Sequence, residues 1–183
     1  MPFFRRSATR RDEFESAAMP HLDELYRSAR RMLGDGARAD DVVQDAYLRA
    51  WRSFHTFQPG TNCRAWLYRI LVNAVHDYRK RWMASAPADD SEKILDRREA
   101  PAPTPDRLTD EDILRALDEL PAAYRDAVVL ADVEQFSYRE ISELLEVKQG
   151  TVMSRLHRGR SLLRDKLRTV ADAYGLPAAE AGT

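Results

Sequence analysis

The sequence has few of the residues that build disulfides, metal centres and tight turns. Its 183 residues include one cysteine, Cys63, together with 4 histidines and 7 glycines. A single cysteine excludes an internal disulfide and a multi-cysteine zinc site, and no two histidines stand at ligand spacing. Scarce glycine favours helices over turn-rich sheets. We therefore expect an all-α protein that binds no metal.

Long hydrophobic runs and catalytic motifs are also missing. No apolar stretch reaches the length of a membrane span, and the N-terminal residues lack the apolar core of a signal peptide. There is no glycine-rich phosphate loop and no nucleophile beside a base, and the carboxylates of residues 40–45 have no histidine partner for a metal pair. We expect a cytoplasmic protein with no membrane insertion, no catalytic residues and no cofactor.

Positive and negative charges are nearly balanced but unevenly distributed. The chain has 29 Lys and Arg against 30 Asp and Glu, for a net charge of -1. Because the net charge is close to zero, a basic segment in this chain is a local patch and not a sign that the whole protein is basic. The length suits two small domains, and 44% hydrophobic residues can build their cores.

Residues 136–167 are typical of a helix-turn-helix, two short helices joined by a tight turn. Ser137 stands three residues before Glu140, which is the spacing of a capping box, and Phe136 and Ile141 have the spacing of a hydrophobic staple. The first helix is therefore predicted to begin at Tyr138.

The second helix of this unit has a dry side and a basic side. Val152, Leu156 and Gly159 repeat on one side with helical spacing. The other side carries arginines and small hydroxyl groups, which suit contacts with phosphates and base edges. A solvated amphipathic helix is the alternative interpretation. The candidate duplex-binding residues are Thr151, Ser154, Arg155, His157, Arg158 and Arg160.

The first half of the chain also follows helical spacing, with two predicted helices separated by residues 34–36. Residues 12–33 form the first, with Pro20 as a kink or as the point where the helix restarts, and residues 38–54 form the second. The second is predicted to bury Val43, Tyr47, Ala50, Trp51 and Phe54. Its outer face is either plain solvated surface or a docking face for an arginine-bearing partner helix. That face comprises Asp41, Gln44, Asp45, Leu48, Arg49 and Arg52.

A loop and a third helix, over residues 64–82, combine aromatic, amide and basic groups. Such mixtures are typical of sites that bind unpaired bases, because aromatic rings stack on bases while cations follow the phosphates. Alternatively, Trp66 packs on the preceding loop. Cys63, at the start of this helix, is interpreted as a small semi-buried residue rather than a redox sensor. The candidates are Phe57, Gln58 and Asn62 in the loop, and Trp66, Arg69, Asn73, His76 and Lys80 on the helix.

Proline and acidic residues set the domain boundary. Residues 84–107 scatter Pro87, Pro101 and Pro103 among carboxylates, which predicts a flexible linker between domains at 12–83 and 108–174. In the second domain Thr109 is a helix cap and Pro121 begins another helix.

Four segments then resemble a known family, the extracytoplasmic-function (ECF) sigma factors of bacterial RNA polymerase. They are DVVQDAYLRAWRSF (41–54), FQPGTNCRAWLYRILVN (57–73), ALDELPAAYRDAVVLADVEQFSYREISELL (116–145) and GTVMSRLHRGRSLLR (150–164). The resemblance covers nearly the whole chain outside its tails and linker. It is strongest to the thiol-oxidative-stress branch, through PGTNCRAWLYRIL and GTVMSRLHRGR.

The resemblance implies a function and partners. The outer face of residues 41–52 would dock on the clamp coiled coil of core RNA polymerase. The loop and the Asn73 stripe would open and read the minus-10 promoter element, with Phe57, Gln58 and Asn73 at a flipped base. The basic helix would read the minus-35 element, its domain would contact the polymerase flap, and the acidic linker would follow the RNA-exit path. Control by an anti-sigma factor, of a small zinc-binding kind in this branch, is also implied.

Two positions depart from the family pattern. Lys148 stands where relatives often have proline, so the turn is less pre-organised, although Lys148 adds a phosphate contact to the duplex-binding set. Asp77 would repel phosphate unless it points aside or pairs with Arg81.

Two other classes compete with a sigma factor. A stand-alone regulator would need an effector or phosphoacceptor domain and a dimer seam, and the first half has no phosphoacceptor βαβ pattern. An enzyme would need a phosphate-binding loop, a metal site or a nucleophile beside a base, and the sequence shows none of these motifs.

Overall fold

The computed structural model describes residues 9–85 and 107–176, and every regular element in these two ranges is helical. The first domain contains α1 (Arg10–Ala18), α2 (Leu22–Leu33), α3 (Gly36–Ser53) and α4 (Cys63–Ser85), with 3-10 turns at Met19–His21 and Phe54–Thr56. The second contains α5 (Asp110–Asp118), α6 (Ala122–Val128), α7 (Tyr138–Leu144) and α8 (Gln149–Ala173). The all-α prediction is confirmed. Most of the predicted linker, residues 86–106, lies outside the described residues.

Local sequence signals set the helix ends in the first domain. Thr9 caps α1 in a capping box with Asp12, and Pro20 lies in the 3-10 turn before α2. Gly34 ends α2 with a left-handed φ of 73°, which a side chain would strain, and Asp35 caps α3 by accepting from the Arg38 N–H. The predicted break at residues 34–36 is confirmed.

The second domain begins and turns where the capping residues predict. Thr109 and Ser137 form capping boxes with Asp112 and Glu140, and α7 begins at Tyr138. Between α6 and α7 the chain makes one π-helical turn, Val129–Val133, which widens the helix end. Glu134 follows this turn directly and is buried.

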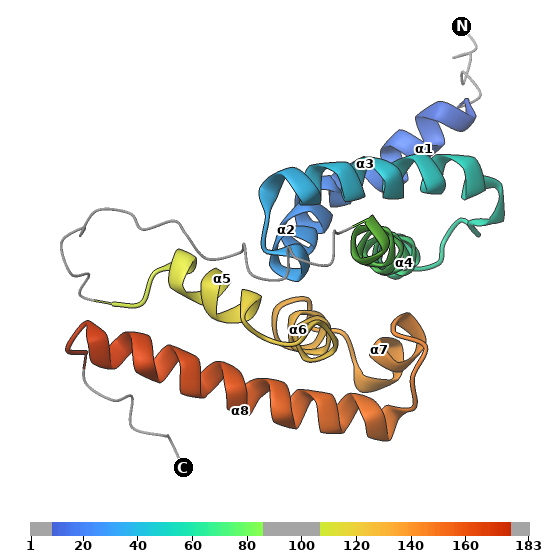
Figure 1. Ribbon diagram of the computed structural model, residues 1–183. Helices are drawn as coiled ribbons and strands as arrows, with labels where there is room; N and C mark the ends of the chain where they lie inside the picture. Colours follow the sequence, from blue (N-terminus) through green and yellow to red (C-terminus); the bar gives the residue numbers. More distant parts are fainter. Residues whose placement is uncertain (1–8, 86–106, 177–183) are drawn as a thin grey trace, which may run out of the picture.

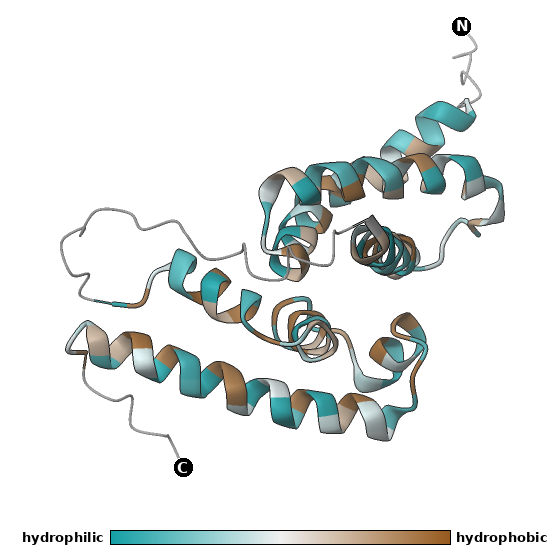
Figure 2. Ribbon diagram, in the orientation of Figure 1, coloured by the Kyte–Doolittle hydropathy of each residue, from teal (hydrophilic) through white to brown (hydrophobic). Residues whose placement is uncertain are grey.

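Each domain has a core of aliphatic side chains. In the first domain Leu25, Val42 and Leu71 are fully or almost fully buried between α2, α3 and α4. In the second, Ile141 and Leu156 are buried between α7 and α8. The helices accordingly carry alternating hydrophobic and hydrophilic segments (Figure 2). None of the helices in the described parts of the chain is both long and apolar enough to cross a membrane.

A close backbone approach fixes α8 against α6. A Cβ atom added to Gly159 would lie 2.8 Å from Val128 Cγ2 and 3.2 Å from the Tyr124 carbonyl oxygen. Only a residue without a side chain therefore fits where the two helices meet.

The predicted burial of α3 was wrong at one position. Small side chains, Ala39, Ala46 and Ala50, form its inner face together with Val42 and Val43. Trp51 is 38% exposed because it lies at the flank of this narrow face. Its ring packs edge-on against Phe14, with ring centroids 5.2 Å apart, and the Arg10 guanidinium stacks on it.

The two domains pack against each other. Figure 1 shows α1–α4 above α5–α8, with α8 along the bottom, and α2 and α4 contact α5, α6 and α7. At Gly34 the approach is so close that an added Cβ would lie 1.9 Å from Asp118 Oδ1. Both domains contribute to one continuous hydrophobic cluster, from Phe14 to Leu156.

Candidate nucleic-acid and polymerase interfaces

The turn between α7 and α8 is well ordered without a proline. Glu146 takes a left-handed φ of 53°, and the Ser142 hydroxyl donates to the Val147 carbonyl at 2.6 Å. Lys148 is the N-cap residue of α8, with φ −65° and ψ 148°, and its side chain is exposed. The Val147 N–H also donates to the Ser142 carbonyl oxygen at 3.1 Å, so two hydrogen bonds hold the turn that a proline would otherwise stiffen.

The predicted duplex-binding face of α8 projects into solvent over most of its length. Ser154, His157 and Arg158 are exposed, and Thr151 and Arg155 are half-buried beside them. The Arg158 guanidinium lies 3.4 Å from the Tyr124 hydroxyl, to which it donates. The structure therefore brings these five residues together on or beside one open face.

Arg160 does not share that arrangement. Its guanidinium donates to both carboxylate oxygens of Asp132, at 3.0 and 2.6 Å, and these hydrogen bonds raise the pKa of Arg160. Asp132 belongs to the π-helical turn after α6, on the side toward which α8 packs. The assignment of Arg160 to the duplex-binding face stays a prediction, and a phosphate or base would have to compete with Asp132 for the side chain.

The predicted stripe on α4 is only partly open. Asn73 and Lys80 are exposed. Arg69 is also exposed but lies 3.8 Å from the Glu143 carboxylate of α7, and His76 lies 3.5 Å from the Asp126 carboxylate of α6. Part of the stripe therefore faces the second domain.

The loop before α4 is held by a cluster of aromatic rings. Phe57 stacks on Phe54, with ring centroids 5.7 Å apart, and its centroid lies 5.2 Å from that of Trp66. The alternative interpretation of Trp66, packing on the preceding loop, is thus correct. A pocket of about 910 Å³ opens beside Phe57, between the loop and α1, where Arg10 and Glu13 also line it.

Two loop amides have different surroundings. The Asn62 side-chain oxygen accepts from the Ala65 N–H at 3.0 Å and so caps α4. Gln58 is exposed, and the hydrogen bond that the Thr61 hydroxyl donates at 2.7 Å goes to its backbone oxygen rather than to its side chain. Gln58 is consequently better placed than Asn62 to contact a base edge.

Cys63 begins α4 in a partly buried position. Burial raises the pKa of its thiol, which disfavours the reactive thiolate. This environment matches the interpretation of Cys63 as a packing residue. In the described part of the chain no three His, Cys, Asp or Glu side chains gather in a way that could hold a metal ion.

The outer face of α3 presents a mixed apolar and charged surface. Asp41, Gln44 and Arg52 are exposed, and Leu48 is 49% exposed among them. Asp45 lies at the edge of this face, where it accepts from Arg49 at 2.8 Å.

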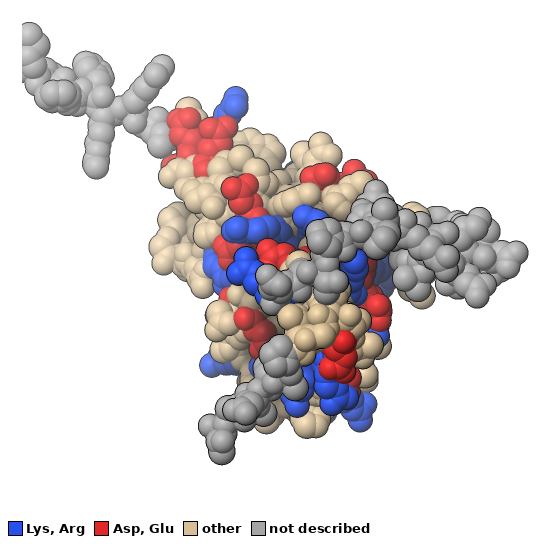
Figure 3. All heavy atoms as spheres, turned by 90° about the vertical axis from the view of Figure 1, so that its left-hand side faces the viewer, with Lys and Arg blue, Asp and Glu red and all other residues tan. Residues whose placement is uncertain are grey.

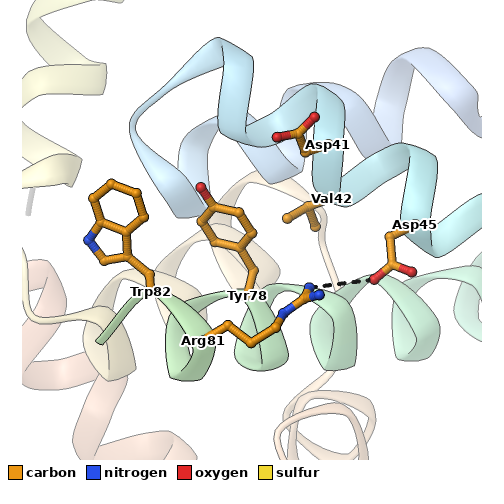
Figure 4. A pocket seen from close by; sticks show the side chains of 6 residues that line it. All are labelled: Asp41, Val42, Asp45, Tyr78, Arg81 and Trp82. Carbon is orange, nitrogen blue, oxygen red and sulfur yellow. Dashed lines mark ion pairs between the residues drawn. The ribbon is translucent and has the colours of Figure 1, made fainter. Parts of the chain in front are cut away.

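A pocket of about 370 Å³ lies between α3 and α4 next to these residues (Figure 4). Asp41 and Asp45 line it from α3, and Tyr78, Arg81 and Trp82 line it from α4. Arg81 reaches across to Asp45 at 3.8 Å. The outer face of α3 is therefore continuous with a groove that carries both carboxylates and rings.

Asp77 points toward α3 rather than away from the protein. It accepts from Arg49 at 2.6 Å, and this hydrogen bond lowers the pKa of its carboxyl group. The expectation that Asp77 pairs with a cation is thus met by Arg49. On the side of the molecule shown in Figure 3, patches of Lys and Arg lie near patches of Asp and Glu.

Sequence reasoning missed the residues that join the two domains. Arg64 and Arg79 of α4 form ion pairs with Glu134 and Asp126 of the second domain. Tyr68 and Val72 lie between these arginines on α4 and are fully buried. A second apolar flank on α4 was the sequence signal for this interface, because one small domain cannot bury both flanks of the same helix.

Comparison with family models defines the class of the protein. Residues 18–83 match sigma-70 region 2, and residues 110–163 match sigma-70 region 4. A region 2 and a region 4 in one chain define a sigma-70-type transcription initiation factor. More narrowly, the chain belongs to the ECF RNA polymerase sigma factors.

Three relatives illustrate this membership. The chain is 41% identical to ECF sigma factor SigE of Mycolicibacterium smegmatis over 84% of its own length and 64% of that protein, so it spans less than two thirds of SigE. It is 40% identical to EcfG of Rhodopseudomonas palustris over 80% and 79%. Its fold matches sigma factor RpoE, solved with the anti-sigma factor NepR from Bartonella quintana, with a TM-score of 0.68 and 30% identity over 85% of this chain and 97% of that one.

Proposed function

We propose that this protein is a promoter-specificity subunit that binds core RNA polymerase and directs initiation at promoters with minus-35 and minus-10 elements. One observation carries the proposal: a capped helix-turn-helix with an open basic face and a helix with an exposed amide and basic stripe occur in one chain. The first suits intact duplex and the second suits unpaired bases.

The second domain would read the minus-35 element through α8. Arg158 and Arg155 supply guanidinium groups that pair with phosphates or with guanine edges, and Thr151 and Ser154 fit close to the backbone or a base. Lys148 at the N-cap adds a charge beside the helix N-terminus, where phosphates bind favourably. The same domain would contact the polymerase flap.

The first domain would hold the opened minus-10 strand. The pocket beside Phe57 has an aromatic wall, which suits a flipped base, and three charged side chains of α1, Arg10, Asp12 and Glu13, also line it. Gln58 and Asn73 would contact base edges, and Lys80 would contact the backbone. Asn62 would contribute mainly by capping α4 and so fixing the loop.

The outer face of α3 would dock on the clamp coiled coil of the polymerase. Leu48 would give an apolar centre to this contact, and Asp41, Gln44 and Arg52 would give a polar rim. Asp45 Oδ2 already pairs with both Arg49 and Arg81, so a partner cation would compete with these two arginines for the carboxylate.

We further propose cytoplasmic action, no catalytic chemistry and control by an anti-sigma factor, because RpoE is a relative solved with NepR. Membership of the thiol-oxidative-stress branch, with a zinc-binding anti-sigma factor, is a narrower proposal based on the segments at residues 59–71 and 150–160. Burial raises the pKa of the Cys63 thiol, which disfavours a redox-sensing thiolate at this position.

Strand opening with purified core polymerase tests the minus-10 assignment. A fluorescent base in the minus-10 region of a cognate promoter reports opening, and Asn73→Ala and Phe57→Ala should lower that signal while binding to a minus-35 duplex stays unchanged. Arg168→Ala, on the exposed end of α8, is the control. Normal opening by both variants would remove the assignment.

A further inference from the structure

One arginine at the flank of α8 is already paired with a carboxylate. Arg160 Nε donates to Asp132 Oδ2 at 3.0 Å, and Arg160 Nη2 donates to Asp132 Oδ1 at 2.6 Å. Two parallel N–H···O bonds are the geometry in which an arginine and a carboxylate pair most firmly. The Arg160 side chain is 43% exposed and that of Asp132 is 38% exposed, so DNA can approach both.

The backbone holds Asp132 in place before any ligand binds. Asp132 belongs to the π-helical turn after α6, in which the Glu134 N–H donates to the Val129 carbonyl oxygen at 3.0 Å, and Val129 is fully buried. The Gln135 side-chain amide donates to the Asp132 carbonyl oxygen at 2.7 Å, and Gln135 has a left-handed φ of 58°. Such a conformation in a residue other than glycine persists only where its surroundings enforce it. The carboxylate is therefore pre-positioned for Arg160.

Arg158 has a different kind of partner. Its guanidinium donates to the neutral Tyr124 hydroxyl at 3.4 Å, so its charge is not cancelled. Arg160 stands two residues further along α8, which places it about 200° around the helix axis from Arg158. A pose of α8 that presents Arg160 to a phosphate therefore turns Arg158 away from the base edges.

The Asp132–Arg160 ion pair changes what a phosphate contact can contribute. An arginine that neutralises a phosphate releases condensed cations from the DNA, and this release is the main source of sequence-independent affinity. For Arg160, a phosphate must first replace Asp132, so the guanidinium exchanges one oxyanion for another. The exchange also leaves the Asp132 carboxylate unpaired beside negatively charged DNA, which is repulsive. Arg160 should thus add little to non-specific binding.

We propose that Asp132 is a specificity-determining residue of the second domain: it withholds the Arg160 charge from phosphates, which weakens binding to unrelated duplex and leaves reading of the minus-35 element by Arg158 unchanged. This inference rests on the proposed function for the identity of the ligand, duplex DNA. Asp132 acts through Arg160 and is a positioning residue. Its effect matters because a genome offers a vast excess of non-specific sites.

Asp132→Asn tests the proposal, because it keeps the shape of the side chain and removes its charge. Fluorescence anisotropy follows the full chain on two short labelled duplexes, one of random sequence and one with the minus-35 element of a promoter that the chain transcribes with core polymerase. The variant should bind the random duplex at least about threefold more tightly at about 50 mM salt. Its loss of affinity between about 50 and 200 mM should grow about 3.5-fold, as for one added phosphate contact. Affinity for the minus-35 duplex should stay within about twofold.

A double-mutant cycle shows whether Asp132 acts through Arg160. In an Arg160→Ala background, Asp132→Asn should change nothing, because the cation that it frees is gone. A gain that persists there would mean that Asp132 repels DNA by itself, and it would overturn the proposal. Weaker binding of the random duplex by a folded Asp132→Asn chain would also overturn it, since the ion pair would then be purely structural. Equal gains on both duplexes would refute the role in specificity.

Two control variants separate this effect from simpler ones. Glu15→Gln breaks the exposed Arg11–Glu15 ion pair of α1, at 2.7 Å, and changes the net charge equally, far from α8 (Figure 1). Tyr124→Phe removes the neutral partner of Arg158. Neither should steepen the salt dependence on the random duplex. The same steepening in Glu15→Gln would assign the effect to net charge and contradict the proposal.

Arg160→Lys covers the case in which Asp132→Asn misfolds. An ammonium group cannot form both parallel hydrogen bonds, so Asp132 holds it less firmly at an unchanged net charge. The random duplex should bind more tightly, by less than with Asp132→Asn, and unchanged or weaker binding would overturn the proposal. If Arg158→Ala leaves binding to the minus-35 duplex unchanged, the proposed function fails instead, and the salt dependence on the random duplex still decides whether Asp132 withholds Arg160.

Discussion

The two surfaces proposed to bind DNA differ in how far they are open. The basic face of α8 is open, and Ser154, His157 and Arg158 project from it into solvent. The stripe on α4 is divided, because Asn73 and Lys80 are exposed while His76 is paired with the second domain. A ligand of the α4 stripe would therefore compete with Asp126 for His76 and with Glu143 for Arg69.

The largest expected effect is a loss of stability in the second domain, caused by a substitution in its core. Leu156→Ala removes a side chain that is almost fully buried under the basic face and should lower the free energy of unfolding of the second domain by about 2–5 kcal/mol. Chemical denaturation followed by circular dichroism measures this loss. The unfolding transition of the first domain should stay unchanged. A single, unshifted transition would show that Leu156 does not anchor α8.

Reversing a charge on α3 should affect polymerase binding and neither DNA surface. Asp45→Arg would place three cations together, because Asp45 now pairs with Arg49 and Arg81. We expect a loss of at least about thirtyfold in affinity for core polymerase, as at a binding hot spot. Co-purification with tagged core enzyme measures it, with Asp165→Asn as control. Undiminished capture would refute the docking face.

Two arginines of α8 provide the next comparison. Arg158→Ala should weaken binding to a minus-35 duplex about tenfold or more, because an exposed guanidinium that reaches a base or phosphate is lost. Arg160→Ala should weaken it much less, since Arg160 is held by Asp132. Fluorescence anisotropy with duplex DNA gives both values. Equal losses of duplex affinity would show that Arg160 contacts the duplex in spite of its ion pair with Asp132.

The smallest effect concerns the turn. Lys148 has φ −65°, which proline also adopts, so Lys148→Pro should raise the unfolding free energy by about 0.4–1 kcal/mol through the unfolded state. Duplex binding should become slightly weaker and less salt-dependent because one phosphate contact is lost. A destabilised variant would show that the backbone before Lys148 cannot accept proline.

The helices could be predicted because their ends carry local chemical signals. The Ser137 capping box, Pro20 and Gly34 act within a few residues, and the structure confirms each. Helical spacing failed for Trp51, because its position falls at the edge of a face that alanines define. It also gave no sign of the ion pair of Arg160, whose partner Asp132 is positioned by a π-helical turn that spacing does not reveal.

The contact between domains could not be predicted from local patterns. Arg64 and Glu134 are 70 positions apart, and only packing brings them together. Arg79 and Asp126 are 47 positions apart and likewise meet only in the folded chain. A buried ion pair looks in sequence like any exposed charge, so its partner has to be found in three dimensions.

Run-off transcription with purified core polymerase on fragmented genomic DNA of the source organism tests the central claim most directly. The account predicts discrete promoter-initiated transcripts that require the chain, disappear with Asp45→Arg and weaken with Arg158→Ala and Asn73→Ala. Transcripts that are the same with and without the chain would contradict it.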